Sequence, residues 1–296
     1  MDNNTDILNF PMSALVKIDG GLGSQMWQYA LGVAVEHHSP LRALHDLSWY
    51  YFHGKDINNK CNRLFILDKV FKNVRLRLPK EDLRQRFILN LDNYPGSYRK
   101  FDPSIIARKT PVYLGGYYPN AKYIVSVADT IRNIYNFTVA LSERNKKLLA
   151  DIMTTTAPVA VHVRRGDYVG SRHDVVGPGF FLQALNWISC HLAPVTPTFF
   201  VFSNGMEWAK EHLSSAPYNF VYVDNNDNDS GQVDMFLMAQ CKHFIISNSS
   251  MSWWAAWLSS RSANKVVIMP DKWVADEKPD EKYSMRVDGW QVLPAI

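Results

Sequence analysis

Two adjacent arginines, Arg164 and Arg165, directly follow a largely apolar run of the sequence, Val159–Val163. The β-branched residues of this run predict a buried strand. Ligands of open α/β sheets bind at the carboxyl ends of the strands, so two guanidinium groups at that position indicate a site for an anion such as phosphate. A solvated loop with a structural Arg–Asp pair is the alternative that this stretch alone leaves open.

The alternation of side chains along an extended strand predicts which of these residues face the same side of the sheet. If the backbone is still extended here, His162 and Arg164 face one side of the sheet, and Arg165 and Asp167 face the other. We hypothesise that one arginine reaches a diphosphate while the protein holds the other, with Asp167 as the candidate partner. The sequence does not decide which arginine does which.

Small polar residues precede a second predicted element. Ser247, Asn248, Ser249 and Ser250 stand before a helical run at Met251–Leu258. Hydroxyl groups at this place are typical of helix N-caps. The free N–H groups of a helix start also attract anions, so both interpretations stay open. The tryptophans of the helix indicate core packing.

A glycine-rich loop joins the first predicted strand to the first predicted helix. Gly20, Gly21 and Gly23 lie between a strand at Ala14–Ile18 and a helix at Ser24–His38. The loop matches neither the dinucleotide-binding fingerprint nor the Walker loop, which requires a lysine. It therefore predicts a tight turn, or a close approach of the backbone to another group.

Strands and helices alternate regularly in the C-terminal half. This alternation predicts a parallel, doubly wound sheet with right-handed crossovers. The predicted strands are Val159–Val163, Thr198–Phe202, Phe220–Val223, Phe244–Ile246 and Val266–Met269. Polar loops leave the carboxyl ends of these strands and are expected to share one rim of the sheet. They are Arg164–Tyr168, Ser203–Gly205, Asp224–Gly231 and Ser247–Ser250.

The candidate for a domain linker is Thr154–Pro158, because three threonines and a proline cannot continue the helix predicted before them. We therefore predict an N-terminal tail over residues 1–13 and a first domain over 14–153, which carries the glycine-rich loop. The linker covers 154–158, and a second domain covers 159–296. Residues 61–101 give no clear pattern.

The composition limits the class of protein. The 296 residues carry a net charge of +4 with scattered lysines and arginines, which predicts no nucleic-acid partner and no polybasic membrane anchor. The three cysteines, Cys61, Cys190 and Cys241, are too few and too far apart for a disulfide framework or a zinc site. The start of the chain does not resemble a signal peptide, and no run approaches the about 18 apolar residues of a membrane span. We expect a cytosolic protein.

Three blocks of the sequence together resemble the signature blocks of the α-1,2-fucosyltransferase family, glycosyltransferase family 11. The blocks are Asp19–Ala30, His162–Tyr168 and Ser247–Leu258. Weaker similarities lie between them, at Phe202–Asn204 with Trp208 and at Asp234–Cys241. The resemblance extends from Asp19 to about Trp290, and three blocks in the same order and spacing are far more specific than any one.

This resemblance implies an α/β enzyme of the GT-B type, with two Rossmann-like domains that face each other across a cleft and a parallel sheet in the C-terminal half. It implies GDP-fucose as the donor, inversion at the anomeric carbon, no cofactor and no required metal. Guanidinium groups and helix-terminal amides can stabilise a departing GDP in place of a metal. The first domain would lie on the acceptor side, and the second would bind the GDP-sugar.

The resemblance also implies residue roles by position. Arg164, Arg165 and Asp167 are expected to be catalytic, and the general base stays open between Asp19, Asp46 and Asp167. The expected donor-binding residues are His162, Arg164, Arg165, Gly20, Gly21, Gly23, Gln25, Ser203, Asn248, Ser249 and Ser250.

This sequence departs from the usual family pattern at a few positions. Ser24 stands where the family usually has asparagine, and Asn204 stands where it often has aspartate. Trp27 and Met251 replace phenylalanine. The histidine–glycine pair expected after Tyr168 is not clear, and His173 is a candidate for a displaced counterpart.

We therefore predict a galactoside α-1,2-fucosyltransferase of bacterial type, which moves L-fucose from GDP-fucose to the 2-hydroxyl of a terminal galactose in a glycan such as an O-antigen. Two alternatives stay open: a related GDP-sugar transferase with another donor or linkage, and a non-catalytic nucleotide- or glycan-binding protein. The expected location is the cytoplasm, with peripheral association at the inner face of the cell membrane if the acceptor is lipid-linked.

Overall fold

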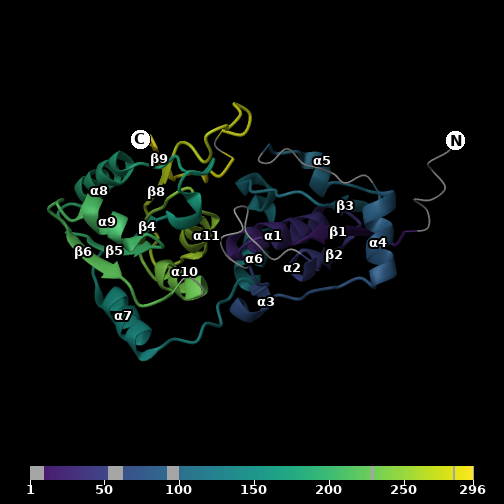
Figure 1. Cartoon of the computed structure of the whole chain (residues 1–296), viewed down its shortest axis with the longest axis horizontal. Helices are drawn as coiled ribbons and strands as arrows, with labels where there is room; N and C mark the ends of the chain where they lie inside the picture. The colour runs from purple at the N-terminus through teal and green to yellow at the C-terminus, as the bar shows by residue number, and fades with distance from the viewer. Residues whose placement is uncertain (1–9, 53–62, 92–99, 228–229, 283, 296) are drawn as a thin grey trace. The chain divides into compact units, whose positions relative to one another are not determined.

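The computed structural model describes residues 10–52, 63–91, 100–227, 230–282 and 284–295. The chain forms two compact units, each with its own parallel β-sheet (Figure 1). Unit 1 comprises Met1–Thr138 and Ser284–Arg286, and unit 2 comprises Val139–Tyr283 and Val287–Ile296. Parallel sheets in both units agree with the α/β class that the sequence predicts.

The first boundary between the units lies at Thr138, upstream of the predicted linker. Helix α7 (Glu143–Thr154) belongs to unit 2, because its Asn145 Nδ2 donates a hydrogen bond of 2.7 Å to Asn226 Oδ1. The predicted linker Thr154–Pro158 is therefore the connection from α7 to the next strand within unit 2. This connection breaks a helix, as the sequence indicates, but it does not separate two cores.

The predicted N-terminal tail also ends earlier than expected. Phe10 is buried, and its ring contacts the Phe87 ring edge-on at 5.1 Å. At the other end of the chain, Ser284–Arg286 returns to unit 1, where the Ser284 carbonyl accepts a hydrogen bond of 2.9 Å from the backbone N–H of Ala121. Unit 1 is thus built from segments that are far apart in the sequence.

The sheet of unit 1 contains three parallel strands in the order β2-β1-β3. They are β1 (Ser13–Lys17), β2 (Arg42–Asp46) and β3 (Val112–Leu114). Helix α1 (Leu22–His38) follows β1, as predicted, and connects it to β2. The remaining helices are α2 (Ser48–Phe52), α3 (Leu67–Val70), α4 (Glu81–Asn90), α5 (Pro103–Ile106) and α6 (Ala128–Ile134). Two 3₁₀ turns, Ala121–Tyr123 and Val125–Val127, precede α6.

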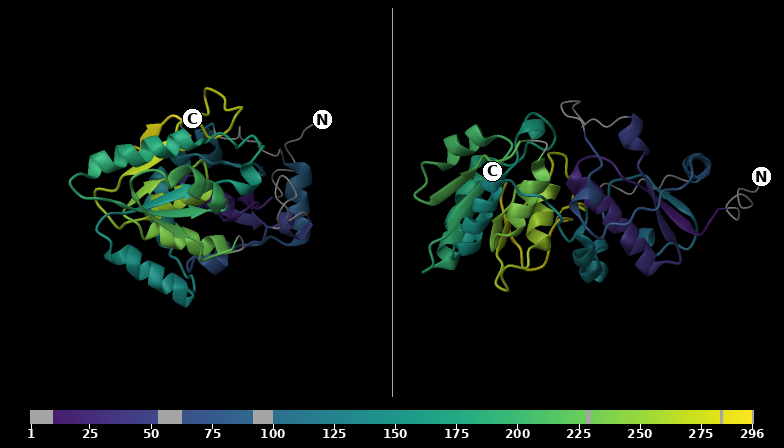
Figure 2. Two further views of the ribbon diagram at one scale, coloured as in Figure 1. Left: turned by 60° about the vertical axis from the view of Figure 1, so that its left-hand side comes forward. Right: turned by 90° about the horizontal axis from the view of Figure 1, so that it is seen from below.

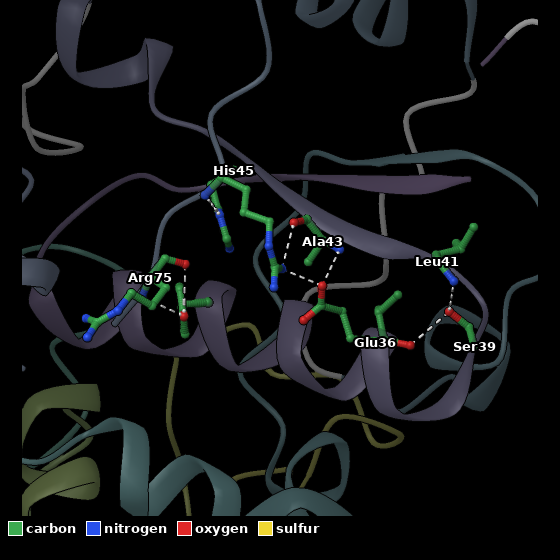
Figure 3. A network of polar contacts seen from close by, with 9 residues as sticks. Glu36, Ser39, Leu41, Ala43, His45 and Arg75 are labelled. Atoms are coloured by element: carbon green, nitrogen blue, oxygen red, sulfur yellow. Dashed lines mark hydrogen bonds and ion pairs between the residues drawn. The ribbon is translucent and has the colours of Figure 1, made fainter. Parts of the chain in front are cut away.

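A polar network joins α1 to the outer side of β2 (Figure 3). The backbone N–H of His45 donates to the Arg77 carbonyl at 2.8 Å, and the Arg77 N–H donates to His45 Nδ1 at 3.0 Å. Glu36 Oε1 accepts from the Ala43 N–H at 3.0 Å and also pairs with the Arg77 guanidinium. Burial, with the nearby charge of Arg77, lowers the pKa of His45 to about 4. His45 is therefore a neutral acceptor that fixes this edge of the sheet.

The sheet of unit 2 contains six parallel strands in the order β6-β5-β4-β7-β8-β9. They are β4 (Pro158–Val163), β5 (Thr198–Ser203), β6 (Asn219–Val223), β7 (His243–Ile245), β8 (Val267–Pro270) and β9 (Gln291–Leu293). The first five lie within one or two residues of their predicted positions, and β9 is a strand that the sequence analysis did not predict. This is the strand order of dinucleotide-binding folds.

Helices cover both faces of this sheet. They are α8 (Pro178–Leu192), α9 (Met206–Leu213), α10 (Gly231–Ala239) and α11 (Ser250–Leu258). Figure 1 shows α8 and α9 on one side of the strands and α10 on the other, and in the left view of Figure 2 the sheet lies between α8 and α7. Trp253 and Trp254 of α11 have no exposed surface, which confirms the core role predicted for the tryptophans. Among the residues described, no helix combines the length and apolarity needed to cross a bilayer.

Candidate functional site

The carboxyl ends of β4 and β7 lie side by side at the point where the strand order of unit 2 reverses. The chain moves outward from β4 to β5 and β6, and then returns to place β7 on the other side of β4. Open α/β sheets bind their ligands outside such a reversal, because the loops there diverge and leave a crevice. The two polar segments that follow these strands, Arg164–Tyr168 and Ser247–Ser250, therefore meet at this position.

Arg164 is held at this position but retains hydrogen-bonding capacity. Its guanidinium pairs with Asp167 and lies over the Tyr168 ring at 5.0 Å from the centroid. The side chain is 18% exposed, and its Nε is buried without a hydrogen-bond partner among the described residues. An unpaired buried donor costs stability, so this N–H indicates a place for an acceptor that binds.

Arg165 is held by three other groups. Its Nη1 lies 2.9 Å from Asp174 Oδ1, and its guanidinium covers the Trp208 ring at 4.7 Å. Its backbone N–H donates to Asn204 Oδ1 at 2.7 Å. Arg165 thus ties the loop after β4 to the start of α9.

The partners of the two arginines differ from those that an extended backbone predicts. Extended geometry ends with β4, and Gly166 takes a φ of +55° at the start of a 3₁₀ turn over Gly166–Tyr168. This turn brings Asp167 back to Arg164, although strict alternation would place them on opposite sides of the sheet. The partner of Arg165 is Asp174, which the sequence analysis did not identify.

Gly166 cannot carry a side chain without disturbing Asn204. A Cβ at this position would lie 2.3 Å from Asn204 Nδ2, and its φ is unfavourable for other residues. We predict that Gly166→Ala destabilises unit 2 by about 2–3 kcal/mol, because the cost of the left-handed backbone adds to the clash. The midpoint of denaturant unfolding measures this loss.

Gly170→Ala is the matched control for this variant. Gly170 has a φ of +71°, but no atom lies within 4 Å of the position that a Cβ would take, so only the backbone cost of about 1 kcal/mol is expected. Equal losses in the two variants would show that the contact with Asn204 is unimportant.

Buried polar groups connect the two strand ends. Ser247 Oγ and His162 Nδ1 lie 3.1 Å apart, and both side chains are buried. Burial, with the charge of Arg164, lowers the pKa of His162 to about 3, so this imidazole is neutral. Asn248 Nδ2 donates to the carbonyls of His173 and Trp273 at 2.9 and 2.7 Å. The side chains of His162 and Asn248 therefore bind other residues of the protein and hold the two strand ends together.

The helix start at α11 lies on the same rim. Ser249 is the N-cap residue, and its side chain makes no capping hydrogen bond. The N–H groups of the first turn, beginning at Ser250, point along the axis of a nine-residue helix whose dipole attracts an anion. At the end of β5, Ser203 Oγ accepts a hydrogen bond of 2.9 Å from the Gly205 N–H.

Four of the predicted donor-binding residues, Gly20, Gly21, Gly23 and Gln25, lie in unit 1. The Gln25 amide is buried and bonded on both sides: Nε2 donates to the carbonyls of Gly20 and Leu64, and Oε1 accepts from the N–H groups of Ile66 and Leu67. Gln25 therefore holds the glycine-rich loop in place, and its amide has no group left for a ligand.

The three candidate bases have different surroundings. Asp167 pairs with Arg164. Asp46 is 1% exposed, accepts from the Ser48 N–H at 3.0 Å and lies 3.8 Å from Arg84 Nη1. Asp19 keeps a side chain that is 26% exposed. Of the three carboxylates, only Asp19 combines substantial exposure with a position outside the arginine pair.

A further polar cluster at the end of β6 was not singled out as a site by the sequence analysis. Asp234 Oδ1 accepts a hydrogen bond of 2.6 Å from Asn226 Nδ2, and Asn226 also contacts Asn145 of α7. Burial raises the pKa of Asp234 to about 6, with the charge of Asp227 adding to the shift. The weak similarity at Asp234–Cys241 was the signal in the sequence that could have marked this residue.

Comparison with known proteins identifies relatives along nearly the whole chain. A family model described as glycosyl transferase family 11 matches residues 62–293. The alpha-1,2-colitosyltransferase of Escherichia coli is 31% identical over 287 residues, which cover 90% of this chain and 94% of that protein. The O-antigen biosynthesis glycosyltransferase WbnK of Escherichia coli is 28% identical, with 92% and 98% covered. Galactoside alpha-(1,2)-fucosyltransferase 2 of Oryctolagus cuniculus is 37% identical over 106 residues, which are 34% of this chain and 29% of that protein.

The fold is similar to that of solved fucosyltransferases. The NodZ alpha-1,6-fucosyltransferase soaked with GDP-fucose superposes with a TM-score of 0.51 at 13% identity, over 84% of this chain and 92% of that one. The fucosyltransferase NodZ from Bradyrhizobium gives the same TM-score at 11% identity, over 84% and 93%. At such low identity the similarity concerns the fold alone, and it confirms the predicted GT-B type.

Proposed function

The chain belongs to glycosyltransferase family 11, and from this membership we propose that it moves L-fucose from GDP-fucose to the 2-hydroxyl of a terminal galactose in a glycan. The proposal names the donor and the linkage, which family membership leaves open. It is supported by the matching region in a galactoside alpha-(1,2)-fucosyltransferase, and by the Arg164 guanidinium and the start of α11 at the β4–β7 rim.

The observation that carries the proposal is Arg164 at the strand reversal of unit 2. A GDP leaving group carries a diphosphate whose negative charge grows as the bond to the sugar breaks. A preorganised guanidinium with a free N–H stabilises that charge more than it stabilises the ground state. The helix start at Ser250 can add N–H groups to the same charge. In this proposal Arg164 contacts the diphosphate, and Arg165 holds the loop through Asp174 and Trp208.

A second candidate donor is a GDP-linked colitose. The Escherichia coli alpha-1,2-colitosyltransferase is 31% identical across 90% of the chain, whereas the similarity to the rabbit fucosyltransferase covers only 34%. Colitose is fucose without its 3-hydroxyl, so a single hydroxyl contact distinguishes the two donors. A site built to hydrogen-bond that hydroxyl would reject the deoxy sugar strongly.

The test uses the purified full chain with GDP-fucose or GDP-colitose, a panel of galactosides and excess EDTA. We predict transfer in which EDTA changes the rate by less than about twofold, because guanidinium and helix-terminal N–H groups supply the positive charge at the leaving group. Mass spectrometry identifies the product, and NMR assigns its linkage and anomeric configuration.

Each outcome of this test has a separate meaning. Transfer of colitose but not fucose replaces the donor in the proposal. Activity that EDTA abolishes and Mg²⁺ restores contradicts the metal-independent mechanism only. No release of GDP above the control without acceptor, from either donor, contradicts the proposed enzyme and favours a non-catalytic binding protein.

The place of action also belongs to the proposal. We assign the reaction to the cytoplasm, with an O-antigen or similar oligosaccharide as the acceptor and peripheral contact with the inner face of the membrane when that acceptor is lipid-linked. The relative named as an O-antigen biosynthesis glycosyltransferase supports this acceptor class. Fractionation of cells that express the chain tests the location.

A further inference from the structure

Unit 1 has a strand reversal of its own. Its central strand β1 is followed by β2 on one side, and β3 is later added on the other side. The loops that leave β1 and β3 must therefore diverge at the carboxyl edge of the sheet, as they do at β4 and β7 in unit 2. By the same rule, this edge is a candidate ligand position of unit 1.

Asp19 stands at this edge with its carboxylate fixed. Gln28 Nε2 donates to its Oδ1 at 2.7 Å, and Lys17 Nζ lies 2.9 Å from its Oδ2. The backbone N–H of Asp19 donates to Gln28 Oε1 at 2.9 Å, and Gln28 has no exposed surface. The carboxylate is therefore held from the protein side. Since an ionised carboxylate accepts about four hydrogen bonds, its exposed side can still accept from a ligand.

Hydroxyl groups also lie in the segments that follow β1 and β3. Tyr117, in the loop after β3, reaches the start of α1, where its hydroxyl lies 3.4 Å from Ser24 Oγ. Both side chains are partly exposed. Gly20 allows this close arrangement, because it has a φ of +71° and a Cβ there would lie 3.1 Å from Ser24 Oγ. On the other side of the loop, the Tyr50 hydroxyl donates to the Gly20 carbonyl at 2.9 Å.

The chemistry of this edge differs from that of the β4–β7 rim. Lys17 is already paired with the carboxylate, and a carboxylate repels phosphate. A neutral ligand with several hydroxyl groups suits a carboxylate acceptor, two hydroxyls and an aromatic ring. A sugar is such a ligand.

We propose that Asp19 binds hydroxyl groups of the acceptor sugar, in an acceptor subsite of unit 1 that Ser24 and Tyr117 complete. The proposal rests on the proposed function for the existence of a sugar acceptor. It also separates Asp19 from the other two candidate bases. Asp46 is buried against Arg84, and Asp167 is paired with Arg164.

The test compares the wild-type chain with Asp19→Asn, Tyr117→Phe and the matched control Asp129→Asn. Asp129 is a fully exposed acid of unit 1 that forms a 3.3 Å ion pair with Arg132 on the same helix. Kinetics with GDP-fucose and lactose give separate KM values for donor and acceptor. Saturation-transfer NMR with methyl β-D-galactopyranoside measures sugar binding without turnover, and thermal unfolding checks that each variant is folded.

We expect Asp19→Asn to raise the KM for lactose by about 10- to 100-fold, the range for loss of a hydrogen bond to a charged group, and to weaken the NMR signal of the galactoside. Tyr117→Phe should raise the same KM by about 3- to 10-fold. For both variants the KM for GDP-fucose should change less than twofold, and Asp129→Asn should leave all these values unchanged.

An acceptor KM for Asp19→Asn within twofold of the wild-type value overturns the proposal. A rise in the donor KM that equals the rise in the acceptor KM also overturns it, because Asp19 would then act on the donor. If Asp19→Asn does not fold, the same criteria apply to Tyr117→Phe. A wild-type chain that binds the galactoside by NMR but turns over no GDP-sugar contradicts the proposed function, while loss of that binding in Asp19→Asn still supports the subsite.

Discussion

Replacing Arg164 with alanine is expected to lower kcat/KM for GDP-fucose by about 10³-fold, which corresponds to about 4 kcal/mol of transition-state stabilisation. The reason is that Arg164 has a buried N–H without a partner at the strand reversal of unit 2, where the leaving diphosphate would bind. Arg164→Lys keeps the charge but loses the planar fork of donors, so a smaller loss of about 10²-fold is expected. Steady-state kinetics with saturating acceptor measures both values.

The comparison with Arg165 makes this prediction specific. Arg165 is paired with Asp174 and covers Trp208, so its substitution should loosen the loop as well as slow the reaction. Both lysine variants should lower the thermal unfolding midpoint, because each guanidinium pairs with a carboxylate and lies over an aromatic ring. Arg164→Lys should lower kcat/KM more than Arg165→Lys, because Arg164 has the buried N–H without a partner. Arg172→Ala is the matched control, because it removes an arginine that pairs with Asp276 at 2.8 Å in a more exposed place. If Arg164→Ala retains activity within about tenfold of the wild type while the chain stays folded, the diphosphate assignment is wrong.

The sequence predicted the sheet of unit 2 far better than the structure of unit 1. In unit 2, strands β4 to β7 are short, largely apolar runs, and each of them is followed along the chain by a helix, so the local pattern and the fold agree. Strand β9 was missed because it has only three residues and follows a long irregular segment. In unit 1, the segments between β2 and β3 contain short helices whose positions depend on tertiary contacts rather than on periodicity.

The predicted domain boundary was displaced for a related reason. Thr154–Pro158 is a clear helix stop, but a helix stop does not show on which core the helix packs. Asn145 and Arg144 of α7 contact Asn226 and Asp224, and these contacts span about eighty residues of sequence. No local pattern contains that information.

The candidate site was located from the sequence, but the partners of its side chains were not. The arginines, the serines before α11 and the strand reversal all follow from strand positions. The 3₁₀ turn at Gly166 depends on a single backbone angle, and it decides that Asp167 pairs with Arg164. Asp174 is nine residues from Arg165 in an irregular segment, where spacing predicts no contact. The sequence therefore does not predict the partners in these buried hydrogen-bond and ion-pair networks, because they depend on the folded backbone.

Acid should destabilise both units between pH 7 and pH 5, because buried histidines remain neutral in the folded state. Three buried histidines have lowered pKa values: His45 in unit 1 at about 4, and His162 and His243 in unit 2 at about 3 and about 4. Burial is the largest cause for each of them, and nearby positive charges add to it. In the unfolded chain these imidazoles take up protons near pH 6.5, so the unfolded state binds more protons than the folded state below that value.

The stabilisation that these neutral histidines contribute to the free energy of unfolding is fully present above pH 6.5. It is lost as the pH falls towards their pKa values in the folded state. Between pH 7 and pH 5, each histidine costs about 2 kcal/mol. Asp234 opposes the loss in unit 2, because its raised pKa of about 6 means that the folded state takes up a proton first. Its contribution over the same interval is about 1 kcal/mol of stabilisation. Unit 2 should therefore lose about 3 kcal/mol, and unit 1 about 2 kcal/mol.

The measurement is denaturant unfolding at several pH values between 5 and 8, with the variants His45→Asn and His243→Asn. The side-chain oxygen of asparagine can replace the Nδ1 that accepts from the Arg77 N–H in one case and from the Val266 N–H in the other, but it cannot take up a proton. Each variant should lose about 2 kcal/mol of the pH dependence in its own unit and leave the other unit unchanged. Asp234→Asn should steepen the acid loss in unit 2. If the stability of the wild-type chain is constant from pH 7 to pH 5, the buried histidines are not neutral in the folded state, and His162 cannot serve as the neutral partner of Ser247 beside Arg164.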